Sequence, residues 1–325
     1  MKAQLSRIWK DWSESKLNLL FRCPLAFKLN YLERVAVPQS VEKVFGATIH
    51  YFLKRFFALK YGYKSPESFS RSFVGFWKGV LEGRHGPGGY NTPPVPLRFR
   101  RQKIDYFGLG IALLKQFYQE NQSFLQGPNE RPRYCETRLV FPFSGFRLTA
   151  ILDRIQPEGG GETIYDYKTS VFQKSEIERA IDTQFTFYSL AYLKKFGQPP
   201  QRLALWYLRP QGSEIIAVPP RTTAHYQELS DKLQEASRFV QAALLPQQTS
   251  CLFAQKTFRY FCLPEMPHPL FLRRDGTHCR FCDFDKICLD YPLYEDPCNR
   301  KILRELQNLP VESEIPQLIL PHLFF

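Results

Sequence analysis

The stretch "DRIQPEGGGETIYDYKTS", residues 153–170, places two aspartates and a lysine around a run of glycines. Its flanks are rich in β-branched and aromatic residues and predict two strands, while the glycines predict a tight turn because glycine adopts positive φ without steric cost. A turn centred at 159–160 pairs positions whose numbers add to 319, so Asp153 lies opposite Asp166. Lys168 follows on the same face of its strand. The hairpin therefore presents two carboxylates and one ammonium close enough to share one ion.

A plainer interpretation of this hairpin is a solvated surface turn with a cross-strand Asp–Lys pair. Such a pair contributes under about 1 kcal/mol to stability. The other motifs of the chain have to decide between the two interpretations.

The composition predicts a well-packed, basic protein. The chain has 325 residues, of which 15% are aromatic, enough for a large core in one elaborated domain or two. Its 44 Lys and Arg exceed its 31 Asp and Glu, for a formal net charge of +13. This excess favours a polyanionic partner, with nucleic acid preferred over an anionic membrane.

Two basic clusters are interleaved with aromatic residues, "PLRFRRQK" and "FLRRDGTHCR". The first contains Arg98, Arg100, Arg101 and Lys103. Such mixtures suit phosphate contact combined with base stacking, and they suit a solvated basic face equally well.

The N-terminal stretch "MKAQLSRIWKDWSESKLNLLF" is interrupted by charges throughout, which argues against a signal peptide. No apolar run approaches the roughly 18 residues needed to cross a bilayer. We therefore expect a cytoplasmic protein without a membrane partner, whose eight cysteines are not disulfides. No G-x-x-x-x-G-K-[ST] phosphate loop occurs, so an NTP-driven motor is not expected.

Hydrophobic periodicity and turn residues predict a chain that alternates helices and strands. Helices are expected over 13–33 (interrupted at Pro24), 40–62, 107–121, 175–197 and 223–244. Strands are expected over 134–141, 146–155, 162–169, 202–210 and 213–220. Residues 62–98 are rich in Gly, Pro and Ser, with an irregular connection over 83–96, and residues 246–325 are expected to be irregular. This order predicts an α/β or α+β sheet flanked by helices.

Cysteines concentrate near the C-terminus, where Cys279, Cys282 and Cys288 form a C-x2-C-x5-C motif. Three thiolates at this spacing suit a metal ion or a cluster. A fourth ligand is needed, and Cys23 and Cys298 are the candidates. Zinc modules normally bring two local pairs, so a one-plus-three split fits an iron–sulfur cluster better. The alternative is three reduced structural thiols.

Two helices carry further candidate residues. Gly46 and His50 lie at i and i+4 of one helix, and a neutral imidazole can ligate a divalent ion. Gln184 and Tyr188 lie one turn apart on the helix after the hairpin, where they can hold a phosphate or position a water. Taken alone, a helical histidine more often serves packing, and a Gln–Tyr pair is usually helix surface.

Together the motifs resemble the RecB-type branch of the PD-(D/E)XK nuclease superfamily, in its iron–sulfur version. That version is found in the AddB subunit of bacterial recombination nucleases and in CRISPR adaptation exonucleases. In chain order the motifs are Cys23-Pro, Gly46-x3-His50, Asp153, Asp166-x-Lys168, Gln184-x3-Tyr188 and C-x2-C-x5-C. "YDYKTS" is especially close to the family's D-Y-K-T. Ala150 stands where the family usually has glycine, and Asp166 where glutamate is commoner.

The resemblance implies two inorganic centres. It implies Mg²⁺ or Mn²⁺ bound by His50, Asp153 and Asp166. It implies that Lys168 orients or activates the attacking water, supported by Gln184 and Tyr188. It also implies a 4Fe–4S cluster held by Cys23, Cys279, Cys282 and Cys288. Glu136, on the first strand, is a further acidic candidate, but a solvent-facing strand position is the preferred interpretation.

The implied fold is restriction-endonuclease-like, with a mixed central sheet flanked by helices. We expect one elaborated domain over 1–325, with a helical N-terminal part (1–129), a nuclease core (about 130–245) and a Cys-rich C-terminal part (246–325) clasped by the cluster.

The implied function is a metal-dependent DNA nuclease, preferably an exonuclease, that acts on single-stranded or duplex ends in recombination, repair or CRISPR adaptation. A helicase or recombination protein would be its partner. The alternatives are a non-cleaving nucleic-acid-binding scaffold or partner subunit with the same fold, and a zinc-stabilised interaction protein.

Overall fold

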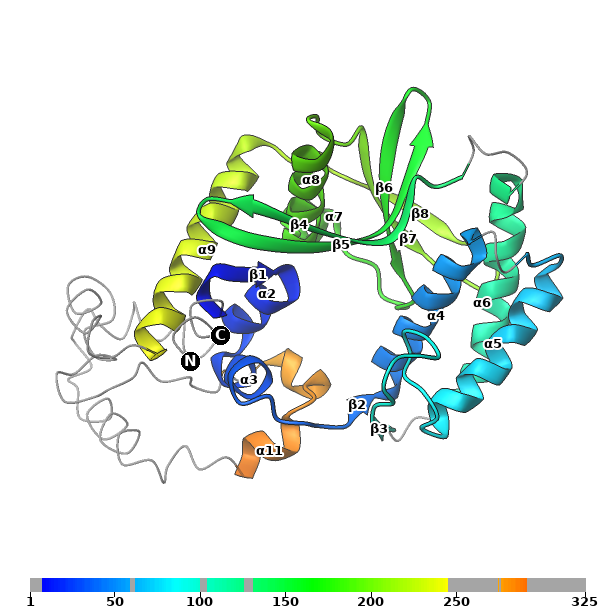
Figure 1. The fold of residues 1–325 in the computed structure, drawn as a ribbon, viewed down its shortest axis with the longest axis horizontal. Coiled ribbons are helices and arrows are strands. Elements are labelled where there is room, and N and C mark those ends of the chain that lie inside the picture. The colour runs from blue at the N-terminus through cyan, green and yellow to red at the C-terminus, as the bar shows by residue number, and fades with distance from the viewer. Residues whose placement is uncertain are drawn as a thin grey trace. The chain divides into compact units, whose positions relative to one another are not determined.

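The computed structural model describes residues 8–58, 62–99, 104–125, 131–244, 274 and 276–290 (Figure 1). The chain divides into two compact units. The first consists of Met1–Ala36, Pro142–Leu148 and Glu228–Phe325, and the second of Val37–Phe141 and Thr149–Gln227. Several residues considered from the sequence lie outside the described part: Arg100, Arg101, Lys103 and Cys298.

A six-stranded mixed sheet has the order β1-β5-β6-β7-β8, and β4 also pairs with β5. Its strands are β1 (Asp11–Ser13), β4 (Tyr134–Phe143), β5 (Phe146–Glu158), β6 (Gly161–Lys168), β7 (Arg202–Tyr207) and β8 (Glu214–Val218). β5 and β6 are antiparallel, β6 and β7 parallel, and β7 and β8 antiparallel. A separate parallel pair joins β2 (Gln39–Ser40) and β3 (Leu97–Arg98). The expected mixed α/β fold with a central sheet flanked by helices is confirmed.

The register of the β5–β6 hairpin is the predicted one. Gly159 and Gly160 have φ of 54° and 90°, the positive values that a two-residue hairpin turn requires. Arg154 pairs with Tyr165 and the register continues to the turn, so every pair adds to 319. The next pair in this register is Asp153 opposite Asp166, which places both carboxylates on one face.

The helices follow the expected order with three differences, of which the first is that the C-terminal stretch expected to be irregular contains the short helices η4 (Thr277–Phe281) and α11 (Asp285–Asp290). In the second unit they are α4 (Val41–Phe57), α5 (Pro66–Leu81), α6 (Tyr106–Asn121), the 3₁₀ turn η3 (Gln122–Leu125), α7 (Glu176–Ala180) and α8 (Thr183–Phe196), with the start of α9 (Thr223–Leu244). In the first unit they are α2 (Glu14–Arg22), α3 (Pro24–Phe27), the π-turn η1 (Lys28–Leu32), η4 (Thr277–Phe281) and α11 (Asp285–Asp290). The break at Pro24 is as predicted.

The second difference is α5, which lies in the Gly-, Pro- and Ser-rich stretch that gave no helical signal. Ser65 and Ser68 form a reciprocal capping box, and Pro66 occupies the first turn, where its missing N–H is not needed. The helix then buries a row of aromatic side chains: Phe69, Phe73, Phe76 and Trp77. Proline and serine here start a helix instead of breaking one.

The third difference is that the long helix expected over 175–197 consists of α7 and α8. Asp182 starts α8, because its side chain accepts a hydrogen bond from the Gln184 backbone N–H at 3.0 Å. Gly197 ends α8 in the left-handed conformation with φ of 79°, as predicted.

An aromatic core holds α4, α5 and α6 together and against one face of the sheet (Figure 1). Tyr165 and Tyr167 of β6 and Trp206 of β7 belong to this core. Because side chains alternate along a strand, Asp166 and Lys168 point to the opposite face. Among the described residues, no helix is long and apolar enough to span a membrane.

Candidate active site

His50, Glu136 and Asp153 meet although they come from α4, β4 and β5. His50 Nδ1 lies 2.8 Å from Glu136 Oε1 and 3.6 Å from Asp153 Oδ2. One ligand atom from each of the three residues lies within 4.8 Å of the other two. Asp153 is held in place because its Oδ2 also accepts a hydrogen bond from the Tyr167 backbone N–H at 2.8 Å. The strand pairing itself therefore orients this carboxylate.

The helix that carries His50 starts and packs in a defined way. Ser40 caps α4 by accepting a hydrogen bond from the Lys43 backbone N–H. One turn before His50, Gly46 faces the residue that follows β6: a Cβ on Gly46 would lie 3.5 Å from Thr169 Oγ1. Gly46 and His50 thus lie on the side of α4 that faces the end of β6, the strand that carries Asp166 and Lys168.

The expectation that Glu136 faces solvent is wrong. Its side chain is only 20% exposed and bonds to His50. Glu136 has a φ of 47°, unusual for a residue inside a strand. A two-residue turn at 144–145 would pair Ile155 with Tyr134. Instead, the backbone N–H of Arg133, one residue earlier, donates to Ile155 O. We infer a β-bulge at Glu136, a device that re-aims a side chain beside a site.

The sequence contained a signal for Glu136. A two-residue turn at 144–145 pairs positions that add to 289, which places Glu136 opposite Asp153. The pairing rule that places Asp153 opposite Asp166 therefore also places a third carboxylate, Glu136, near Asp153. The bulge shifts this pairing by one residue.

Asp166 and Lys168 form the second half of the site with two residues of α8. Lys168 Nζ lies 2.6 Å from Asp166 Oδ2 and donates to Gln184 Oε1 at 3.2 Å. Gln184 Nε2 donates to Asp166 Oδ1 at 2.9 Å, and Tyr188 OH donates to the same oxygen at 3.1 Å. Gln184 therefore links the ammonium to the carboxylate, and its amide orientation is the one that satisfies both.

The charges of the site depend on one another. Burial lowers the pKa of His50, but the Asp153 and Glu136 carboxylates raise it more, so it lies well above its ordinary value. Burial likewise lowers the pKa of Lys168, but the Asp166 carboxylate raises it more. Burial raises the pKa of Asp166 despite the nearby ammonium, and it also raises that of the Tyr188 phenol. Lys168 is therefore a cation at neutral pH, suited to hold an anion or a water rather than to accept a proton.

A family model matches most of the chain, including the segment that contains this hairpin and the helix with Gln184 and Tyr188. The model, described as the PD-(D/E)XK nuclease superfamily, matches residues 11–289. The chain belongs to the PD-(D/E)XK nuclease superfamily. A solved structure titled "Crystal structure of SSO0001" aligns with 86% of this chain and 85% of that chain at 12% identity, with a TM-score of 0.31. No curated protein matches the chain.

PD-(D/E)XK nucleases use divalent metals, and the residues of this member fit such an ion. Carboxylate oxygens and one imidazole are suitable ligands for Mg²⁺ or Mn²⁺. The converging ligand atoms come from His50, Glu136 and Asp153, while Asp166 is not in that group. Its Oδ1 accepts two hydrogen bonds and its Oδ2 faces Lys168. Glu136 is thus a further candidate ligand, which converges with two of the predicted ligands, His50 and Asp153.

The cysteines implied as cluster ligands all belong to the first unit. Cys23 is buried between α2 and α3, and Arg274 of the C-terminal segment donates a hydrogen bond to the carbonyl of Phe21. Burial raises the pKa of the Cys282 thiol, and the nearby Cys23 and Cys279 raise it further. Thiols distant in sequence therefore lie in one region.

These thiols do not have the geometry of a zinc site. A tetrahedral zinc site would hold its sulfur atoms about 3.8 Å apart, since Zn–S bonds are about 2.3 Å. Among the described cysteines, no three Sγ atoms lie within 4.8 Å of one another. The described thiols therefore do not form a converging set of three ligand atoms.

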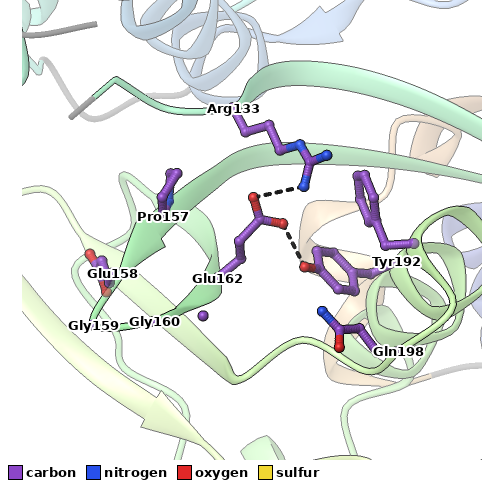
Figure 2. Close-up of a pocket in the computed structure, with 10 residues that line it drawn as sticks. Arg133, Pro157, Glu158, Gly159, Gly160, Glu162, Tyr192 and Gln198 are labelled. Atoms are coloured by element: carbon purple, nitrogen blue, oxygen red, sulfur yellow. Dashed lines mark hydrogen bonds and ion pairs between the residues drawn. The ribbon is translucent and has the colours of Figure 1, made fainter. Parts of the chain in front are cut away.

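A second polar cluster lines a hollow beside the hairpin turn (Figure 2). Glu162 accepts hydrogen bonds from Arg133 at 3.1 Å and from Tyr192 OH at 2.5 Å. The three side chains bond to one another and connect the hairpin to the segment just before β4 and to α8. We assign this cluster a structural role, because its acid is already engaged.

Proposed function

We propose that this member of the superfamily is a metal-dependent DNA nuclease, acting as an exonuclease on DNA ends in recombination, repair or CRISPR adaptation. One observation carries the proposal: His50, Glu136 and Asp153 converge beside the Asp166–Lys168 ion pair. In a solvated surface hairpin Asp153 and Asp166 would be exposed, but their exposure is only 6% and 1%.

The residues divide into three roles. His50, Glu136 and Asp153, whose ligand atoms converge, would hold the metal, with Asp166 as the further ligand that the family pattern implies. When bound, such an ion neutralises the scissile phosphate and acidifies a water. Lys168, a cation at the edge of this acidic group, would hold the attacking water or a phosphate oxygen. Gln184 keeps Lys168 and Asp166 at a fixed distance, and Tyr188 supports Asp166.

DNA is the proposed partner because the chain carries a formal net charge of +13 and belongs to a nuclease superfamily. A non-cleaving scaffold with the same fold remains the alternative function. The intact set of acids and the ordered Lys168–Gln184–Asp166 contacts favour cleavage, since a scaffold does not need them.

The function is tested by incubating end-labelled single-stranded and duplex DNA with the full chain. With Mg²⁺ or Mn²⁺ we expect shortening from the ends, and with EDTA we expect none. Binding without cleavage under every metal condition would favour the scaffold instead.

We further propose that Cys23, Cys279, Cys282 and Cys288 bind a 4Fe–4S cluster. The one-plus-three spacing of the cysteines supports a cluster over zinc. The Phe284 backbone N–H, 3.4 Å from Cys282 Sγ, is the kind of donor that stabilises a cluster thiolate. Linking residue 23 to residues 279–288 would tie two distant parts of the first unit together.

Anaerobically purified protein is then expected to absorb broadly near 400 nm and to contain about four irons per chain. Cys282→Ser should remove the absorbance and lower the melting temperature, because the link between distant segments is lost. Cys262→Ser is the matched control and should remain coloured. Stoichiometric zinc without iron in the same preparation would contradict the cluster.

A further inference from the structure

The segment between Lys168 and Gln184 leaves the candidate active site and returns to it. We call residues 169–182 the site loop. Both ends are fixed at the site, because Lys168 donates to Gln184. The loop carries the four most exposed large apolar side chains of the described residues: Phe172 (89%), Val171 (81%), Ile177 (75%) and Ile181 (65%).

The backbone of the site loop is held by hydrogen bonds from two arginines, although its apolar side chains are exposed to solvent. Arg209 donates to the carbonyl oxygens of residues 170–171 at 2.8 and 3.2 Å. Arg221 donates to those of Arg179 and Asp182 at 2.8 and 3.0 Å. A loop with its backbone fixed in this way keeps its apolar side chains in water, and a concentrated exposed apolar patch marks a binding surface.

Phe172 lies within reach of a strand bound at the site. It follows Lys168 by four residues, so the two Cα atoms are at most about 14 Å apart. A stacked DNA strand advances about 3.4 Å per nucleotide. A strand with a phosphate at Lys168 therefore has a base within about four nucleotides of Phe172.

The polar groups of the loop indicate what it contacts. Lys174 pairs with Asp182 at 2.5 Å, and Gln173 bonds to Glu214, so these side chains engage one another. The loop carries three acids and only two bases, although the chain as a whole is strongly basic. Such a surface does not attract phosphates, but an exposed aromatic ring suits the face of a base.

We propose that Phe172 stacks on an unpaired base of the DNA strand that is being cut. Bases inside a duplex have both faces covered by their neighbours, so this contact selects single strands and frayed ends. The inference rests on the proposed nuclease function and adds a residue that determines its substrate preference. Ile177, on α7, is also highly exposed but is aliphatic, so it is not expected to take part in this contact.

The test is the affinity of the full chain for a single-stranded oligonucleotide in EDTA, where hydrolysis does not occur. A series of oligonucleotides carries one abasic site at successive positions from the bound end. For the unaltered protein, one position should weaken binding by roughly 5- to 100-fold, the range for one lost base stack. In Phe172→Ala the same loss should appear with the intact oligonucleotide, and the abasic site should then have no further effect. Phe172→Trp should restore the position dependence, and Ile177→Ala should leave it unchanged.

Salt separates stacking from phosphate contact. Overall affinity should fall as salt rises through counterion release, while the ratio between the unaltered protein and Phe172→Ala should stay constant. Equal position profiles in these two proteins would overturn the inference and leave a protein partner as the occupant of the patch. Loss of affinity in Ile177→Ala as large as in Phe172→Ala would overturn it too. Absence of cleavage with Mg²⁺ or Mn²⁺ would instead refute the proposed function, whatever the abasic series shows.

Discussion

An Asp153→Asn protein is expected to lose DNA hydrolysis by roughly a thousandfold or more while remaining folded. A catalytic metal supplies several kcal/mol of charge stabilisation, and each 1.36 kcal/mol is about tenfold in rate. Asparagine has nearly the same shape and can still accept the hydrogen bond from the Tyr167 backbone N–H. The change therefore removes a charge and a metal ligand with little effect on packing. Initial cleavage rates, Mn²⁺ titration and melting temperature measure the three consequences separately.

Two further carboxylate variants make this test specific. Glu136→Gln should lower Mn²⁺ affinity by at least roughly 10- to 100-fold, because it removes a ligand charge and changes the contact that orients His50. Glu158→Gln is the control, because Glu158 lies on the same strand but bonds to Tyr165 and Thr163 at the turn. Its cleavage rate should not change. Full activity in Asp153→Asn would rule out the metal site as assigned.

Lys168→Met should reduce hydrolysis by roughly a hundredfold or more while Mn²⁺ still binds. The Lys168 ammonium lies 2.6 Å from Asp166 and contacts Gln184, so it is positioned to hold a water or a phosphate oxygen. Losing one positioned charged group of this kind typically costs two to three orders of magnitude. Methionine keeps the apolar stem, and Asp166 retains its bonds from Gln184 and Tyr188. Single-turnover cleavage combined with Mn²⁺ titration measures both effects.

The control for Lys168 is Lys232→Met, which removes an ammonium from a surface pair with Glu228 at 2.7 Å. It should change neither cleavage nor, by more than about 1 kcal/mol, stability. If Lys168→Met behaves in the same way, the pair with Asp166 is merely a salt bridge. Lys168→Arg keeps the charge but not the geometry, and intermediate activity would indicate that the position of the cation matters.

The central hairpin could be predicted from the sequence because its determinants are local. Glycines that adopt positive φ define the turn, and the two-residue periodicity of strands then places Asp153, Asp166 and Lys168 on one face. The Gln184–Tyr188 pair was likewise predictable as one turn of a helix. The superfamily membership follows from these local patterns in their order along the chain.

Other features depended on long-range packing. The sequence pattern of α5 resembled a loop, and it became a helix because its aromatic side chains enter a core shared with α4 and α6. Asp182 divided the expected long helix because it caps α8 beside the site loop. The exposure of Phe172 was also not visible in the sequence, where an aromatic residue after a strand would normally be assigned to a core.

The sequence by itself thus determined the mixed sheet, the acidic hairpin with its lysine, and the family. The tertiary structure decided which groups meet there. It brought Glu136 and His50 to Asp153, and it left Asp166 bonded to Lys168, Gln184 and Tyr188 instead of in the converging group. The physical reason is that register and turn type follow from neighbouring residues. The approach of α4 and the bulge at Glu136 depend on packing between segments about 90 to 100 residues apart, which no local pattern specifies.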